Sequence, residues 1–127
     1  MADSISRLYA AVLDARAGDP AASRTTRLIR AGLPKAAKKM AEEAVEVAIE
    51  AMNTRTDAVV TESADLIYNL VVLWSLCGVN PDDVGAEMHR REEQMGIAEK
   101  LPKKPLAGAG ADKVAVLEAG RRYGKRR

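Results

Sequence analysis

Two pairs of acidic residues stand at matched distances on either side of a predicted turn centred on Thr54. Glu46 lies eight residues before Thr54, and Glu62 lies eight residues after it. Glu43 and Asp65 lie eleven residues before and eleven residues after the same point. Residues three apart on a helix project from one face, so two antiparallel helices would bring the four carboxylates level, roughly 12 to 16 Å from the turn at ~1.5 Å per residue. The spacing predicts an antiparallel helical hairpin with an acidic cluster between its arms.

This acidic cluster favours a metal site. A single Glu or Asp on a helix is usually part of the solvated surface, and that plain interpretation applies to each acid taken alone. Four carboxylates that converge in a helical bundle repel one another unless cations hold them. Hard oxygen ligands suit Mg²⁺ or Mn²⁺. The matched register of Glu43, Glu46, Glu62 and Asp65 therefore predicts a divalent metal site.

The composition favours an all-α fold. Hydrophobic residues make up 47% of the 127 residues, whereas aromatic residues make up only 3% and phenylalanine is absent. The core must therefore be aliphatic, and the shortage of strand-favouring aromatics points to helices. We expect an antiparallel bundle of about five helices. They are expected at about 4–17, 23–29, 35–53, 56–77 and 80–94.

Capping signals mark most of these boundaries. Ser4, Ser23, Thr56 and Asn80 are the expected N-caps, and Gly32 and Gly78 the expected helix ends.

The segment 56–77 is apolar almost all round in its second half. Such a helix has to be covered on every side. A homodimer with this helix at or near the subunit interface is the favoured interpretation, and a central helix wrapped within one subunit is the alternative. The longest apolar stretch has twelve residues, 66–77, whereas a membrane span needs about 20, so we expect no membrane segment.

The charge divides the chain into two parts. Residues 1–99 carry a net charge of −5 and residues 100–127 a net charge of +7. We expect an all-α domain over 1–100 and a basic C-terminal extension over 101–127, which is more typical of a solvated tail than of a nucleic-acid-binding segment. The single cysteine, Cys77, forms no internal disulfide, and no signal peptide is recognisable, so a cytoplasmic protein is expected.

Basic residues near the acidic cluster are candidates for binding phosphate. Lys38 and Lys39 precede the acids by one turn. On plain grounds Lys39 pairs with Glu43 at i,i+4, but a cation beside a carboxylate cluster also suits the oxygens of a polyphosphate. Arg27 and Arg30 are weaker candidates for the same role.

Asn69 and His89 are two further polar residues of interest. Asn69 lies fifteen residues after Thr54 and is level with Lys39, so either a substrate contact or a structural hydrogen bond is open. His89 is the only histidine, and Ala86 stands three residues before it, where a diiron bundle requires a glutamate. Oxygen-activating iron is therefore not expected.

The sequence KKMAEEAVE at 38–46, followed by ESADLIY at 62–68, resembles phosphoribosyl-ATP pyrophosphohydrolase, the second enzyme of histidine biosynthesis. That family belongs to the MazG-like all-α nucleotide pyrophosphohydrolases, which share a Glu-x-x-Glu then Glu-x-x-Asp signature. The resemblance covers about residues 3–100, including GIAEK at 96–100.

The resemblance implies specific roles for the acidic residues. Glu43, Glu46, Glu62 and Asp65 would hold Mg²⁺, and Glu42 would accept the proton of the attacking water or support a ligand. Phosphoribosyl-ATP would be cut between its α and β phosphates to give phosphoribosyl-AMP and pyrophosphate. A helical homodimer is also implied.

Three positions depart from the family pattern. Ala41 stands where glycine is common, Asn69 where histidine is frequent, and Arg24 where an aromatic residue usually separates Ser23 from Thr25. Two other functions therefore stay open. One is a MazG-like enzyme that cleaves other nucleoside triphosphates, and the other is a non-catalytic helical dimer.

Overall fold

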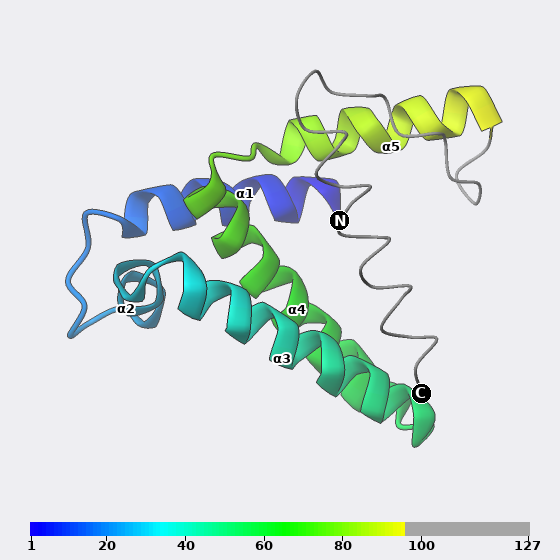
Figure 1. Ribbon diagram of the computed structural model, residues 1–127, viewed down its shortest axis with the longest axis horizontal. Helices are drawn as coiled ribbons and strands as arrows, with labels where there is room; N and C mark the ends of the chain where they lie inside the picture. Colours follow the sequence, from blue (N-terminus) through cyan, green and yellow to red (C-terminus); the bar gives the residue numbers. More distant parts are fainter. Residues whose placement is uncertain (96–127) are drawn as a thin grey trace, which may run out of the picture. The chain divides into compact units, whose positions relative to one another are not determined.

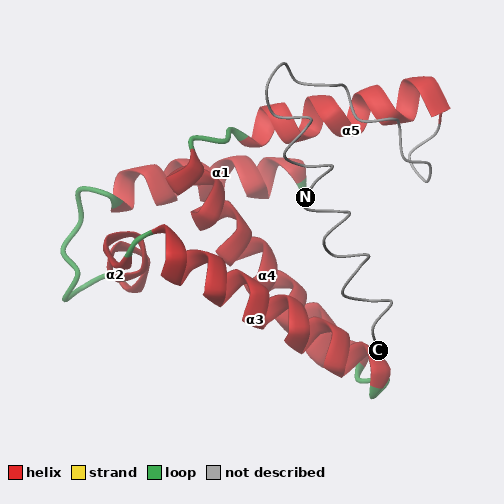
Figure 2. Cartoon of the chain, in the orientation of Figure 1, coloured by secondary structure: helices red, strands yellow, loops and turns green. Residues whose placement is uncertain are grey.

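A computed structural model describes residues 1–95 of the chain, and these residues form helices and connecting turns without a β-strand. The helices, shown in Figures 1 and 2, are α1 (Ala2–Ala15), α2 (Arg24–Ala31), α3 (Leu33–Met52), α4 (Thr56–Cys77) and α5 (Pro81–Met95). Residues Met1–His89 form one compact unit, and α5 runs from it into a second unit that begins at Arg90. The predicted all-α class is confirmed. The GIAEK motif and the basic extension over 101–127 lie outside the described residues.

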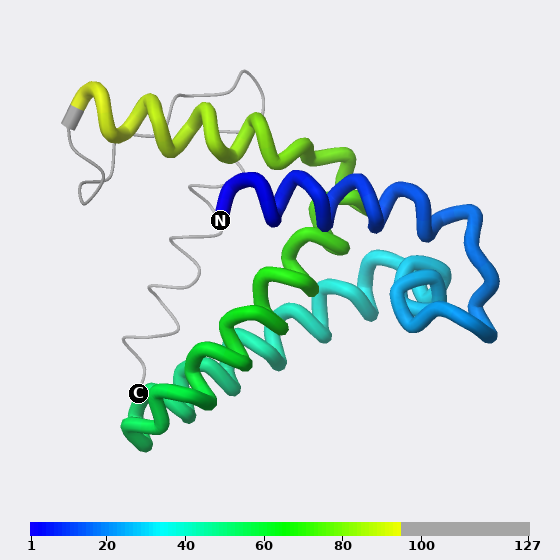
Figure 3. Tube along the Cα trace, turned by 180° about the vertical axis from the view of Figure 1, so that it is seen from behind, coloured from blue at the N-terminus to red at the C-terminus, as the bar shows by residue number. Residues whose placement is uncertain are grey.

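The hairpin of α3 and α4 is the most extensive helix pair of the unit. The two helices run antiparallel and side by side from their turn, as the two opposite views show (Figures 1 and 3). At the turn, the N–H of Arg55 donates to the carbonyl of Glu50 (3.1 Å), and Thr54 adopts a left-handed backbone with φ of 55°. The hairpin predicted from the acidic spacing is confirmed.

The hydrophobic core lies where α1 and α2 pack against the second half of α4. Val12 of α1 and the adjacent Val71 and Val72 of α4 are fully buried. Partly buried aliphatic and aromatic side chains surround them, among them Leu8, Leu28 and Ile67. The core therefore fixes the far end of the hairpin and leaves its turn end to project.

Helix α2 has a capped N-terminal end that is joined to α1, and a glycine at its C-terminal end. The Ser23 hydroxyl accepts from the N–H of Thr26 (3.1 Å), so this predicted N-cap is confirmed. The buried Thr26 hydroxyl in turn donates to the carbonyl of Ala15 in α1 (2.7 Å). Gly32 ends α2 and caps α3 with φ of 94°, a conformation that favours glycine.

Two predicted N-caps are wrong. Helix α1 begins at Ala2, because the N–H of Ile5 already donates to the carbonyl of Met1, and Ser4 lies inside the first turn. Helix α4 begins at Thr56 itself, because the N–H of Val59 donates to the carbonyl of Arg55. In both cases the backbone ladder starts earlier than the hydroxyl residue suggests. The predicted cap at Asn80 and the helix end at Gly78 are confirmed.

Helix α4 is long and apolar enough to cross a membrane when judged by length and composition alone. The central helix of a helical bundle has the same character, so this property is weak evidence for a membrane. Its packing against α1, α2 and α3 gives α4 the place of a central helix. The absence of a membrane segment stays a prediction.

Candidate metal centre

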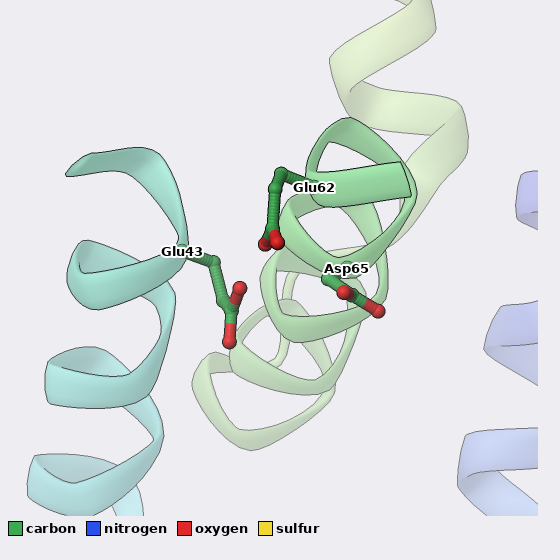
Figure 4. Close-up of side chains that lie close together, drawn as sticks. All are labelled: Glu43, Glu62 and Asp65. Atoms are coloured by element: carbon green, nitrogen blue, oxygen red, sulfur yellow. The ribbon is translucent and has the colours of Figure 1, made fainter. Parts of the chain in front are cut away.

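Three carboxylates meet between the arms of the hairpin. Glu43 projects from α3 towards Glu62 on α4, and Asp65 lies one helical turn further along α4 (Figure 4). One carboxylate oxygen from each residue lies within 4.8 Å of those of the other two. Hard oxygen ligands at such separations, supplied by two rigid helices, fit a divalent cation such as Mg²⁺ or Mn²⁺. We call these three residues the carboxylate cluster.

The carboxylate cluster is partly shielded from water. Glu43 is only 8% exposed, and Glu62 and Asp65 are half-buried. The ammonium group of Lys39 lies 3.3 Å from Oε1 of Glu43, as the i,i+4 spacing predicts. One ammonium beside three carboxylates leaves an excess of negative charge, and a buried charge without a partner is costly.

The pKa of Glu62 reflects this excess charge. Partial burial, the negative charge of Glu46 and a hydrogen bond with the Glu43 carboxyl all raise the pKa of Glu62 above its ordinary value of 4.5. The cluster therefore retains a proton more readily than an isolated glutamate does. A bound divalent cation would compete with that proton for the same oxygens.

Glu46, the fourth predicted ligand, is not among the three converging residues. Its side chain is exposed, although its charge is close enough to act on Glu62. The hairpin register places the two residues level, eight positions on either side of Thr54. Three of the four predicted ligands are thus brought together, and the role of Glu46 stays a prediction.

Glu42 and Lys38 lie beside the cluster in sequence but form an exposed pair of their own. The Lys38 ammonium lies 4.0 Å from Oε1 of Glu42, and both side chains are largely exposed. Exposed pairs of this kind contribute little to stability. The predicted roles of Glu42 as a proton acceptor and Lys38 as a phosphate contact stay predictions.

The two arginines that the sequence singled out on α2 make hydrogen bonds to the loop between α1 and α2. Arg27 donates to the carbonyl of Pro20 (2.8 Å), and Arg30 donates to the carbonyl of Gly18 (3.3 Å). These bonds account for both side chains locally. The predicted contact of Arg27 with substrate gains no support from them.

Asn69 is buried with only half of its amide satisfied. Its Nδ2 donates to the backbone carbonyl of Asp65 (2.8 Å), and its side chain is 2% exposed. Within residues 1–95, no donor reaches its Oδ1 atom. A buried acceptor without a donor costs about 1–3 kcal/mol. The predicted contact of Asn69 with substrate stays a prediction.

Sequence reasoning did not predict the contact between Arg24 and Tyr68. Its guanidinium lies over the ring of Tyr68, with Cζ 5.9 Å from the ring centroid, and Oη of Tyr68 lies 2.6 Å from Oγ1 of Thr25. The sequence offered one indication that this position is unusual, since Arg24 stands where the family usually has an aromatic residue. The contact itself joins residues that are more than forty positions apart and has no signature in local spacing.

A separate cavity of about 330 Å³ lies away from the carboxylate cluster. It is mainly apolar and is bordered by side chains of α1, the end of α4 and the first half of α5, including Ile5, Trp74 and Met88. No residue of the carboxylate cluster borders it. The cavity therefore adds nothing to the metal centre.

A helical hairpin with carboxylates converging from both arms is what the resemblance to the all-α nucleotide pyrophosphohydrolases led us to expect. Comparison with known proteins makes this assignment specific. The family model described as phosphoribosyl-ATP pyrophosphohydrolase matches residues 5–92, which span most of α1, all of α2 to α4 and most of α5. The chain belongs to the phosphoribosyl-ATP pyrophosphohydrolase family.

Individual relatives agree with this family. The chain is 63% identical over 106 residues to a phosphoribosyl-ATP pyrophosphatase 2 of Bradyrhizobium diazoefficiens, covering 84% of this chain and 79% of that protein. It is 55% identical over the full length of both chains to a phosphoribosyl-ATP pyrophosphatase 2 of Rhodopseudomonas palustris. A phosphoribosyl-ATP pyrophosphatase of Gluconobacter oxydans is 46% identical, with 80% of this chain and 78% of that protein covered.

Proposed function

We propose that this protein hydrolyses phosphoribosyl-ATP to phosphoribosyl-AMP and pyrophosphate in histidine biosynthesis, with Mg²⁺ or Mn²⁺ bound at the carboxylate cluster. The convergence of Glu43, Glu62 and Asp65 within 4.8 Å carries the proposal. The family assignment and the names of the relatives supply the substrate and the reaction. A cytoplasmic location follows from the biosynthetic role, and homodimerisation is part of the proposal.

The proposed ligands are Glu43, Glu62 and Asp65, with Glu46 as a fourth. A divalent cation bound to them would neutralise phosphate oxygens and lower the pKa of a bound water. Glu43 suits this role because it is buried and already paired with Lys39, which holds its carboxylate in place. Glu46 is level with Glu62, and its carboxyl is close enough to raise the pKa of Glu62.

The remaining residues are proposed to bind substrate and move a proton. Lys39 provides an ammonium group beside the cluster for a phosphate oxygen, with Lys38 one residue away. The oxygen of water adds to one of the two phosphorus atoms joined by the oxygen between the α and β phosphates. The bond from that phosphorus to the bridging oxygen breaks, the bridging oxygen keeps the electron pair and leaves with the other phosphate, and the proton released from the water goes to Glu42. The unpartnered Oδ1 of Asn69 would accept a hydrogen bond from a hydroxyl or amino group of the substrate.

The test is pyrophosphate release in the presence of Mg²⁺, with phosphoribosyl-ATP offered beside ATP and the common deoxynucleoside triphosphates. The wild-type protein is expected to prefer phosphoribosyl-ATP strongly. The Asp65→Asn variant is expected to lose at least about 100-fold in rate, since a charged carboxylate is replaced by a neutral amide, which binds a metal ion more weakly. Asp57→Asn is the matched control, because Asp57 is an exposed acid in the first turn of the same helix.

Three results would count against the proposal. An active Asp65→Asn variant would remove the metal assignment. Turnover of other nucleotides only would select the MazG-like alternative. Absence of all turnover together with absence of Mn²⁺ binding in calorimetry would select the non-catalytic dimer.

A further inference from the structure

Two adjacent residues at the start of α2 hold one aromatic side chain of α4. The hydroxyl groups of Thr25 and Tyr68 share a hydrogen bond of 2.6 Å, and the guanidinium of Arg24 lies 5.9 Å above the centroid of the Tyr68 ring. Thr25 and Tyr68 are both half-buried, whereas Arg24 is exposed. The hydroxyl contact fixes the ring, and the ring in turn fixes the plane on which the guanidinium rests.

Tyr68 places this contact beside the metal centre. It follows Asp65 by three residues on α4, a rise of about 4.5 Å along the helix, so both side chains project from the same side of the helix. The cation of Lys39 reaches the cluster from α3, whereas Arg24 comes from α2. Two cations on different helices therefore contact side chains in this part of the hairpin, since Lys39 pairs with Glu43 and Arg24 lies over Tyr68.

The guanidinium of Arg24 has unused hydrogen-bonding capacity. Within residues 1–95 its contact with Tyr68 is its only interaction, whereas Arg27 and Arg30 of the same helix each donate to a loop carbonyl. An arginine carries five N–H donors in a planar fork that matches phosphate oxygens, and stacking on an aromatic ring reduces the entropy lost on binding. An oriented guanidinium with free donors next to a metal centre is arranged to bind an anion.

We propose that Arg24 binds a phosphate group of the substrate, with Tyr68 and Thr25 as the residues that position it. The proposal rests on the function proposed above. Phosphoribosyl-ATP offers two phosphate sources, namely its triphosphate and the phosphate of its phosphoribosyl group. The chemistry that Arg24 recognises is the same in both, a phosphate that accepts two parallel N–H bonds.

The experiment measures equilibrium binding by calorimetry with phosphoribosyl-ATP and with ATP, using Ca²⁺ in place of Mg²⁺ to slow turnover. Arg24→Gln is expected to weaken the binding of phosphoribosyl-ATP by about 10- to 100-fold, the range for lost hydrogen bonds to a charged group. Arg24→Lys is expected to restore part of the affinity, because it keeps the charge but loses the fork. Arg24→Tyr places an aromatic side chain without a guanidinium beside Tyr68 and is expected to bind as weakly as Arg24→Gln.

The two ligands distinguish the two phosphate sources. Weaker binding of phosphoribosyl-ATP alone assigns Arg24 to the phosphoribosyl phosphate, and weaker binding of both ligands assigns it to the triphosphate. Arg7→Gln is the control, since Arg7 is an exposed arginine on α1 that donates to Ser4. Calorimetric Mn²⁺ binding and the urea midpoint must stay unchanged in the Arg24 variants.

Failure of this proposal differs from failure of the proposed function. Unchanged affinity of Arg24→Gln for both ligands overturns the proposal. A loss of nucleotide affinity that is accompanied by weaker Mn²⁺ binding and a lower urea midpoint also overturns it. Absence of phosphoribosyl-ATP hydrolysis by the wild-type protein in Mg²⁺ overturns the proposed function, while the binding comparison still decides the role of Arg24.

Discussion

At the scale of single residues, the repulsion within the carboxylate cluster acts on the pKa of Glu62. Burial and the neighbouring acids Glu46 and Glu43 raise its pKa, because each of them disfavours its charged form. The folded protein therefore binds a proton at Glu62 more tightly than the unfolded chain does. This difference couples the stability of the metal-free protein to pH.

We expect the metal-free protein to become less stable as pH rises from 4.5 through the raised pKa of Glu62. A group with a raised folded-state pKa contributes stability that is complete below its unfolded pKa and is lost as the pH passes its folded pKa. Urea unfolding midpoints measured over this pH range in a chelator would show the fall. Glu62→Gln should remove it, because the amide does not titrate.

Mn²⁺ provides the control for this pH dependence. When the cation compensates the carboxylates, the midpoint is expected to stop falling with pH and to rise instead, since deprotonated ligands bind the metal better. Asp57→Asn, outside the cluster, should keep the wild-type pH profile in chelator. If the urea midpoint of Glu62→Gln fell with pH as that of the wild type does, the titration of Glu62 would not be the cause of the fall.

The same residues show what sequence spacing can predict at a site. Glu43, Glu62 and Asp65 were found because helical register counted from one turn fixes their relative height and face. Arg24 was missed because its position depends on how α2 packs against α4, which is set by core contacts rather than by spacing. The free Oδ1 of Asn69 likewise depends on what surrounds it in space.

At the scale of helices, the connection between α1 and α2 is held by a close approach at Gly18. A Cβ atom on Gly18 would lie 2.6 Å from Oγ1 of Thr26 and 3.2 Å from the carbonyl of Ala15. These two atoms already form the 2.7 Å hydrogen bond that joins the helices. A side chain at position 18 would have to displace that bond.

Gly18→Ala is expected to destabilise the protein by about 1–3 kcal/mol, the range for overpacking at a buried contact. Gly85→Ala is the matched control, because a Cβ there meets no atom within 4 Å and alanine is favoured inside the helix. That variant should be more stable by about 0.5–1 kcal/mol. Urea unfolding measures both changes. Equal midpoints for the two variants would show that the Gly18 contact is not tight.

Helix boundaries mark the limit of prediction at this scale. The residues Ser23, Gly32 and Gly78 were assigned correctly because a cap hydroxyl or a positive φ imposes a strong local requirement. Ser4 and Thr56 have the same side-chain chemistry as Ser23 but lie inside their helices. Where these two helices begin is set by backbone hydrogen bonds to the carbonyls of Met1 and Arg55. The residue types at these positions do not indicate such bonds.

At the scale of the whole molecule, the projecting half of the hairpin exposes apolar side chains. Val45, Ile49 and Met52 follow the i, i+4, i+7 spacing of one face of α3, and Val60 lies early in α4. Their exposure ranges from 49% to 86%. The core around Val12 covers the other half of the hairpin, so nothing in residues 1–89 covers this face.

This exposed face supports the proposed homodimer and refines its location. The sequence pointed to the apolar second half of α4, but Val71 and Val72 there are completely covered within one subunit. The face with Val45, Ile49 and Met52 is the stronger candidate for the contact with a second copy. Large exposed apolar patches of this kind commonly mark protein–protein interfaces.

We expect the wild-type protein to have twice the 13.6 kDa mass of one chain in sedimentation at micromolar concentration. Ile49→Asp should shift it to the mass of one chain, because an unpaired charge in the centre of an apolar interface is costly to desolvate. Leu13→Asp is the control, since Leu13 is an exposed leucine of α1 and lies away from this face. The Ile49→Asp variant should remain helical by circular dichroism, since Ile49 is half exposed in the single chain. A wild-type protein that sediments as a single chain would remove the dimer, and an unaffected Ile49→Asp dimer would move the interface to another face.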